Sequence, residues 1–227
     1  MKPNERRICA GLVARRECWS LTWRGRFLVL GLMAATLTFL VLEAEPFLAP
    51  TERVPADLLV IEGWTQPFTM KQAANEFTSG RYQRAILVRT IADLDDKYES
   101  GQFAGDYLVN LLEKYGVPAE KITALYPLVA KKDRTYSSAL EVKKWLARQG
   151  MAVKSLDLMT MGAHARRSRL LYEKAFGDGT RIGVISMGDV AYERRHWWRV
   201  SEGVREVLGE TIAYIYARFF FRPPDSM

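Results

Sequence analysis

The residues best suited to chemistry lie in the stretch from Leu156 to Arg169, which reads LDLMTMGAHARRSR. It begins as an apolar run with the pattern of a buried strand, breaks at Gly162, and continues at helical spacing with His164 and Arg167. In an open α/β sheet, ligands bind beyond the carboxyl ends of the strands. The start of the following helix presents backbone N–H groups and the positive end of a dipole, which favour an anion. The stretch therefore predicts an anion-binding site.

His164 and Arg167 are three residues apart, so they share one face of a helix. An imidazole and a guanidinium placed in this way can bind the same anion, with the arginine acting as a bidentate fork. The alternative is that Arg167 pairs with an acidic neighbour and His164 only ends the strand. Arg166 and Arg169 point elsewhere and are expected on the solvated surface.

Polar residues at the ends of other predicted elements are candidates for the same site. Thr135 opens a predicted helix, where its hydroxyl would act as an N-cap or bind a ligand phosphate. Glu62 directly follows the first predicted strand and would be a general base or a metal ligand. Gly63 would let the ligand approach the backbone. The predicted ligand-binding residues are Gly63, Thr135, Ser138, His164 and Arg167, with Glu62, Trp64 and Arg134 as further candidates.

Cysteine and histidine usage excludes several kinds of site. Both cysteines, Cys9 and Cys18, lie in the N-terminal segment, so the remainder has no disulfide framework and no thiol nucleophile. The only histidines are His164 and His196, and no Cys/His spacing of a zinc site exists, so no metal is expected.

Nucleotide and hydrolase motifs are also missing. No G-x-G-x-x-G follows the first predicted strand, and the chain has no P-loop sequence. The segment from Gly183 to Gly188 approaches a nucleophile elbow, but Val184 stands where glycine is needed. Ser186 is therefore interpreted as an ordinary residue at the end of a strand. No cofactor can be named from these motifs.

The N-terminus divides into a basic segment and an apolar one. Residues 1–26 carry seven basic and two acidic residues, which accounts for +5 of the formal charge of +7. The following run, from Phe27 to Leu42, has no polar face and is predicted to be a transmembrane anchor. A buried core helix and a cleaved signal peptide are the alternatives. The basic flank predicts a cytoplasmic N-terminus in a bacterial inner membrane, with the rest of the chain periplasmic or extracytoplasmic.

The remainder of the chain predicts a short tether and one α/β domain. Residues 43–56 contain three prolines and are interpreted as a stiff tether. Residues 57–222 alternate strands with helices, which predicts a Rossmann-like, mostly parallel five-stranded sheet with helices on both faces. The predicted strands are 57–61, 85–88, 121–126, 156–161 and 181–186, and the predicted helices are 67–79, 101–115, 135–148, 163–176 and 194–221, the last in two pieces around Gly209.

Two aromatic segments near the C-terminus remain open in role. The segment from Arg194 to Arg199 mixes basic and aromatic residues, but its expected place outside the membrane argues against nucleic acid as a partner. A core helix with Trp197 or Trp198 buried, or an exposed face for a phosphorylated lipid or glycan, are the two interpretations. The run from Ile212 to Phe221 is either a last helix packed on the sheet or an aromatic surface resting at the membrane.

Four stretches together resemble the SanA/ElyC/YdcF-like family of bacterial envelope proteins, built on the domain of unknown function first numbered 218. The resemblance covers the segments from Asp57 to Gly63, from Gly116 to Ile122, from Arg134 to Ala139 and from Thr160 to Arg167. The last of these, with histidine and arginine three apart after a strand, is the most specific. The glycine-rich exits of the first two strands in that family are absent here, and Arg134 and Ser137 replace an asparagine and a glutamate of the third motif.

The resemblance implies a Rossmann-like sheet, an N-terminal anchor and a role in envelope integrity or in polysaccharide and peptidoglycan precursor handling. The expected function is that of a membrane-anchored envelope protein that binds an anionic metabolite such as a lipid-linked sugar phosphate or a nucleotide. Processing of that metabolite is an open extension of this hypothesis. One alternative is a non-catalytic scaffold for envelope-synthesis proteins, with Trp197 and Trp198 as the contact region. A second alternative, implied by one branch of the family, is a protein that binds S-adenosylmethionine.

Overall fold

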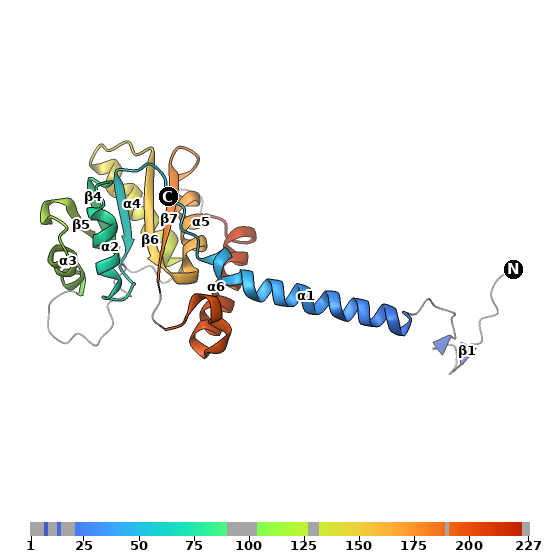
Figure 1. Ribbon diagram of the computed structural model, residues 1–227. Coiled ribbons are helices and arrows are strands. Elements are labelled where there is room, and N and C mark those ends of the chain that lie inside the picture. Colours follow the sequence, from blue (N-terminus) through green and yellow to red (C-terminus); the bar gives the residue numbers. More distant parts are fainter. Residues whose placement is uncertain are drawn as a thin grey trace. The chain divides into compact units, whose positions relative to one another are not determined.

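A computed structural model describes residues 7–8, 13–14, 21–89, 104–126, 132–188 and 191–223 (Figure 1). The chain forms two compact units, Met1–Leu40 and Val41–Met227. The first contains a short antiparallel pair, β1 (Arg7–Ile8) and β2 (Val13–Ala14), and the larger part of helix α1 (Trp23–Leu48). The second contains the sheet and every other described helix.

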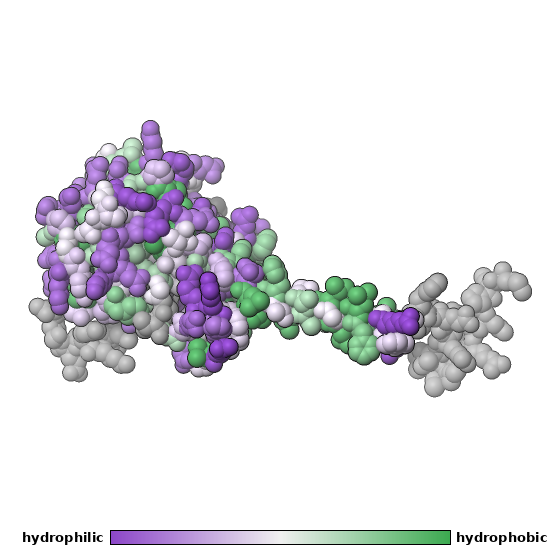
Figure 2. All heavy atoms as spheres, in the orientation of Figure 1, coloured by the Kyte–Doolittle hydropathy of each residue, from purple (hydrophilic) through white to green (hydrophobic). Residues whose placement is uncertain are grey.

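Helix α1 is the one described helix that is long and apolar enough to cross a membrane. Its 26 residues span about 39 Å at 1.5 Å per residue, more than the roughly 30 Å of a hydrocarbon core. None of its most apolar 18-residue window is buried, unlike the core helix of the alternative interpretation. Figure 2 shows the helix as mainly hydrophobic. The predicted transmembrane anchor is therefore a candidate membrane span.

The segment predicted to be a tether differs from that expectation at its start, because α1 continues through Pro46 to Leu48. Its last turns pack within the second unit, where the backbone carbonyl of Val41 accepts a hydrogen bond from Trp197 Nε1 at 3.0 Å. Glu45 is buried and pairs with Arg194 at 2.7 Å. The three prolines had suggested a non-helical tether. These contacts instead stabilise the end of a helix that contains Pro46.

Five parallel strands form the sheet, as predicted: β3 (Leu58–Glu62), β4 (Arg84–Val88), β5 (Ile122–Leu125), β6 (Ser155–Met161) and β7 (Arg181–Met187). Their spatial order is β5-β4-β3-β6-β7. The chain first builds outward from β3 in one direction and then crosses to build from β6 in the other. In such a sheet, ligands bind at the carboxyl ends of the two strands where the order reverses, here β3 and β6.

Helices cover both faces of the sheet, which explains why its strands are nearly continuous apolar runs (Figure 1). Successive side chains point to opposite faces. Leu59 and Ile61 pack with helices α2 (Thr69–Thr78) and α3 (Ala104–Lys114). Leu58 and Val60 pack with helices α4 (Arg134–Arg148) and α5 (Ala165–Phe176) and with the end of α6 (Ser201–Phe219). Three short 3-10 helices complete the described part: η2 (Ala119–Lys121), η3 (Gly162–His164) and η4 (Arg194–Arg199).

The predicted break of the last helix at Gly209 is wrong. Helix α6 runs through Gly209, where an added Cβ would meet nothing within 4 Å. An interior glycine costs a helix only about 1 kcal/mol and does not end it. The break lies instead at Val200, which is extended and separates η4 from α6. The structurally required glycine is Gly203, whose absent Cβ would lie 2.3 Å from the carbonyl oxygen of Trp197.

A buried carboxylate on β6 fastens the entering chain to the sheet. Asp157 is fully buried and accepts hydrogen bonds from Val54 N at 2.9 Å and from the Tyr82 hydroxyl at 2.8 Å. Burial, and next the hydrogen bond to Asp157, raise the pKa of Tyr82 well above its usual range. On β7, Gly183 leaves room for this carboxylate, since a Cβ there would lie 1.8 Å from Asp157 Oδ1.

We expect Gly183→Ala to destabilise the protein by about 3 kcal/mol, because the methyl group overpacks a closed site and displaces a buried carboxylate from its donors. The measurement is chemical unfolding of the full-length protein in detergent. Gly179→Ala is the matched control, since nothing lies within 4 Å of its added Cβ. Equal stabilities for the two variants would contradict the role given to Asp157.

Candidate functional site

A buried carboxylate lies where the sheet order reverses. Glu62 ends β3, is 2% exposed, and accepts three hydrogen bonds on its Oε2 atom. The donors are Trp64 Nε1 at 3.1 Å, Ser168 Oγ at 3.0 Å and the hydroxyl of Thr160. A buried charge is tolerated only with such partners. Glu62 therefore joins β3, β6 and α5 at the edge where ligands are expected.

His164 lies beside this carboxylate. The chain turns out of β6 at Gly162, whose φ of +51° favours glycine, and His164 follows at the end of η3. Its Nε2 atom is 3.5 Å from the Thr135 hydroxyl and 3.7 Å from Glu62 Oε2. The Trp64 ring meets the imidazole edge-on, with 4.7 Å between the ring centres. The ring is thus held in place with its Nε2 atom directed at a hydroxyl and a carboxylate.

The other imidazole nitrogen meets a carboxylate and a guanidinium. His164 Nδ1 is 2.9 Å from Glu210 Oε1 and 2.7 Å from Arg167 Nη2. A carboxylate only accepts and a guanidinium only donates, so the tautomer decides which contact is the hydrogen bond. If Nδ1 carries the proton, it donates to Glu210 and leaves Nε2 free to accept the Thr135 proton. If Nδ1 accepts from Arg167, Nε2 is the donor.

Arg167 binds Glu210 in the bidentate geometry, with Nε 2.7 Å from Oε2 and Nη2 2.9 Å from Oε1. Burial by itself raises the pKa of Glu210, but the hydrogen bonds from Arg167 and His164 outweigh it and lower the pKa to about 2. Burial likewise opposes the charge of Arg167, and Glu210 more than compensates, so the pKa of Arg167 is raised. Both groups are therefore charged at neutral pH.

A cavity of about 80 Å³ adjoins this cluster between α4, α5 and α6. Its polar wall contains Asp133, Arg134, Thr135 and Arg167, and its apolar wall includes Leu171, Ala217 and Phe221. The first N–H groups of helix α4 have no partner within the helix. Arg167 uses Nε and Nη2 for Glu210 and His164, and within the described part of the chain these contacts leave Nη1 unused. The cavity thus has hydrogen-bond donors and the Asp133 carboxylate on one side and an apolar surface on the other.

The structure brings most of the predicted site residues together. Thr135, His164 and Arg167 meet as described, Glu62 and Trp64 contact the imidazole, and Arg134 lines the cavity. The ion pair that sequence reasoning kept as the alternative for Arg167 is present, with Glu210 as its partner. Arg166 and Arg169 point away, toward the Phe47 ring and toward Glu52 and Glu173 respectively.

Three predicted details differ. Thr135 is not the N-cap of helix α4, because the helix begins at Arg134 and the cap position is taken by Asp133 in a left-handed conformation. Ser138 is buried on α4, and no hydrogen bond joins it to the cluster in the described structure. Beside Gly63, the space that a ligand was expected to use is filled by Arg89, 2.8 Å from an added Cβ.

Sequence reasoning missed Glu210, Thr160 and Ser168. Glu210 is 46 residues from His164 and looks like any other glutamate of a helix with mixed composition. Thr160 and Ser168 flank His164 in sequence, and their positions at a strand end and on the inner face of α5 were the available signals. Only the crossing of α6 over α5 identifies Glu210 as part of the cluster.

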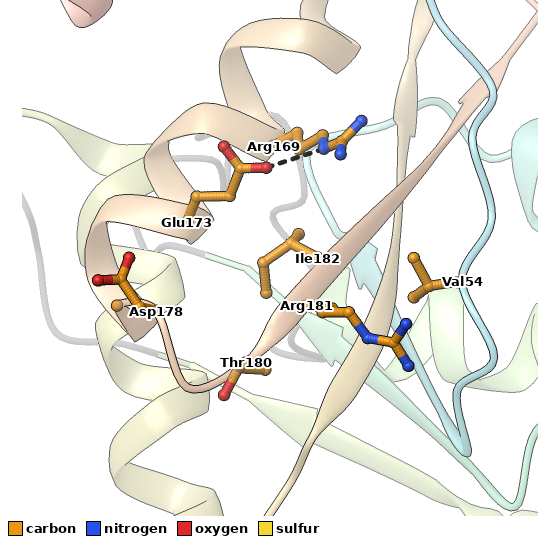
Figure 3. Close-up of a pocket in the computed structure, with 8 residues that line it drawn as sticks. Val54, Arg169, Glu173, Asp178, Thr180, Arg181 and Ile182 are labelled. Atoms are coloured by element: carbon orange, nitrogen blue, oxygen red, sulfur yellow. Dashed lines mark hydrogen bonds and ion pairs between the residues drawn. The ribbon is translucent and has the colours of Figure 1, made fainter.

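Larger hollows lie at the opposite edge of the sheet. One of about 360 Å³, shown in Figure 3, is lined by Arg169, Glu173, Asp178 and Arg181, which starts β7. Arg169 and Glu173 neutralise each other at 2.9 Å (Figure 3). Another of about 670 Å³ borders the segment from Arg53 to Asp57. Both lie at the amino ends of the strands, away from Glu62 and His164, so their size does not make them the better candidates.

Comparison of the chain with protein-family models and with curated proteins gives no match. Among the residues that the structure describes, no group of three or more histidine, cysteine, aspartate or glutamate side chains could hold a metal ion. The resemblance to the SanA/ElyC/YdcF-like family stays a prediction, and the function has to be inferred from the geometry around His164.

We expect Glu210→Gln to destabilise the protein by about 3 kcal/mol at pH 7, because it leaves the buried Arg167 without its counter-charge. The folded-state pKa of Glu210 is below the ordinary value of 4.5, so its stabilising effect is full above pH 4.5 and is lost as the pH falls toward about 2. Unfolding followed from pH 7 to pH 2 should therefore show a shallower acid loss in the variant than in the wild type.

Glu113→Gln is the control for this experiment, since Glu113 lies exposed on α3. It should keep both the stability and the acid slope of the wild type. An unchanged acid slope in Glu210→Gln would contradict the assignment of the shifted carboxyl to Glu210.

Proposed function

We propose that this protein is a membrane-anchored α/β protein that binds a phosphate-bearing metabolite at the His164 cluster. The observation that carries the proposal is the cavity beside Arg134, Thr135 and Arg167, at the carboxyl edge of the sheet. Its volume of about 80 Å³ suits one small charged group. Its apolar wall suits the rest of an amphipathic molecule, such as a lipid-linked sugar phosphate.

Each hydrogen-bond donor of the cavity wall has a defined part in this proposal. The Nη1 atom of Arg167 and the guanidinium of Arg134 would contact phosphate oxygens, and the Thr135 hydroxyl would donate a hydrogen bond. The N-terminus of α4 would add backbone N–H donors and its dipole. Glu210 would hold Arg167 in place, and His164 would contact the Thr135 hydroxyl and orient it toward the ligand.

A second candidate function, turnover of the bound ligand, is favoured by the line from Glu210 through His164 to Thr135. The 2.9 Å between Glu210 and Nδ1 is a hydrogen-bond distance, and the 3.5 Å between Nε2 and the Thr135 hydroxyl would have to shorten on ligand binding for proton transfer. In the tautomer with a proton on Nδ1, His164 would accept a proton from Thr135 or from a water beside it. Steady-state turnover lost in His164→Gln with ligand binding retained would separate this function from simple binding.

The anchor and the resemblance favour the cell envelope of a bacterium as the place of action. The basic residues before α1 would keep the N-terminus in the cytoplasm, with the α/β domain outside the inner membrane. A scaffold for envelope-synthesis proteins is the main alternative, but Trp197, one of its two expected contact residues, is buried against Val41. S-adenosylmethionine is the remaining alternative ligand.

We expect inorganic phosphate and a short-chain isoprenyl phosphate to bind the full-length protein in detergent, measured by titration calorimetry. Arg134→Ala and Thr135→Ala should each weaken binding by about tenfold, the effect of one lost charge-assisted hydrogen bond. Arg181→Ala, at the opposite edge of the sheet, is the control. Binding that is absent, or equal in all variants, would refute the proposed site.

Two further arms of this experiment separate the alternatives. Heat released on addition of S-adenosylmethionine would indicate that this cofactor, and not a phosphate compound, is the ligand. In cells that lack the protein, the variants His164→Ala and Arg167→Ala should fail to correct the envelope defect that its loss causes. A scaffold would tolerate both changes.

We expect alkaline phosphatase fused after residue 223 to be active and a fluorescent protein at the same position to be dark in a bacterial host, because the basic flank retains the N-terminus in the cytoplasm. Replacing Arg24 and Arg26 with glutamate should reduce the phosphatase activity. The opposite pair of results would place the domain in the cytoplasm.

A further inference from the structure

The outer side of helix α6 carries an apolar surface that no described part of the chain covers. Leu208, Ile212, Ile215 and Phe219, called here the outer stripe, are spaced to share one face of the helix. All four are exposed, with Ile212 at 69% and Phe219 at 72%. Soluble surfaces seldom keep several large apolar side chains in one row, so the outer stripe indicates an interaction surface.

The inner side of the same helix is fully used by the domain. Val207 is buried with Trp197 and Leu48, Ala217 packs with the core of the sheet, and Glu210 binds His164 and Arg167. Helix α6 therefore needs no second packing partner for its own stability. The fold of the domain does not require the side chains of the outer stripe to be apolar.

The chain enters the domain beside this helix. Val41, at the end of the apolar run, and Ala44, two residues after that end, pack in the cluster that contains Val207 and Tyr214 of α6. Phe47 meets the Tyr214 ring edge-on, at 5.5 Å between ring centres. The C-terminal turns of α1, from Val41 on, thus belong to the same compact unit as α6 and pack against it.

Charge around the stripe fits a lipid surface. Arg218 and Arg222 are exposed near the C-terminal end of α6, Arg205 near its start is 4.0 Å from the exposed Glu202, and aromatic Tyr216 and Phe220 are exposed beside the stripe. Apolar side chains flanked by arginines and aromatic rings are the composition of helices that lie in the interface of an anionic bilayer. A contact with a second copy of the chain would instead bring these arginines together.

We propose that the outer stripe of α6 lies on the surface of the bilayer that α1 spans, with its apolar side chains in the headgroup–acyl boundary. This inference uses the anchor and the exposed face of α6, and it does not depend on a ligand at His164. If the phosphate-binding site is correct, the two features share one helix, with the cavity lined from its inner side by Ala213 and Ala217.

The test uses full-length protein with Cys9→Ser and Cys18→Ser in nanodiscs of phosphatidylcholine and phosphatidylglycerol. An environment-sensitive dye is attached at Ile212→Cys or, as the matched control, at the exposed Lys144→Cys on α4. With nitroxide-labelled lipid, the dye at position 212 should lose most of its fluorescence and the dye at position 144 should keep it. Equal quenching at the two positions would overturn the proposal.

A second variant isolates the stripe. Ile215→Glu with Phe219→Glu changes only exposed side chains, so the fold and phosphate binding should be retained. The quenching at position 212 should disappear in this variant. Persistent quenching, or discs that hold two cross-linked copies with position 212 protected from lipid, would overturn the lipid assignment. Phosphate calorimetry on the same samples reports separately on the His164 site.

Discussion

The arrangement around His164 depends on one buried carboxylate that must be satisfied. Glu62 ends the first strand of the sheet at the point where strand order reverses, and water cannot solvate it there. Trp64, Thr160 and Ser168 all donate to the same oxygen. A partly satisfied carboxylate would destabilise the sheet edge by several kcal/mol, so these donors have to be present together. Their placement fixes β3, β6 and α5 relative to one another and defines where the imidazole can lie.

The sheet and much of the cluster could be predicted because their signals are local. Parallel strands buried on both faces are short apolar runs, and each of the five is bounded by glycine, proline or charged residues that end it. Topology places Thr135 and His164 at the same end of the sheet, since both come after the carboxyl ends of parallel strands, although β4 and β3 separate β5 from β6. Neither inference needs knowledge of side-chain packing.

The remaining features depend on contacts between distant segments. Glu210 could not be identified because its role arises where α6 crosses α5, and its helical pattern does not distinguish it from Glu206. The helical conformation of Glu43 to Leu48 was missed for the same reason, since the stabilising partner of Glu45 is Arg194, 149 residues away. The glycine pattern was misleading as well: Gly63 makes room for Arg89, and Gly209 breaks nothing.

The pairing of Arg167 with Glu210 has a consequence for how a ligand would be attracted. Arg134 and Arg167 are the cations of the cavity wall, but Asp133 lines the same wall, Glu210 pairs with Arg167, and Glu62 and Glu206 also act on Arg167. Such a site exerts little long-range pull, so association would be nearly insensitive to ionic strength. Discrimination between anions would come from the directions of the donors, which favours a tetrahedral oxyanion of matching shape over the most highly charged competitor.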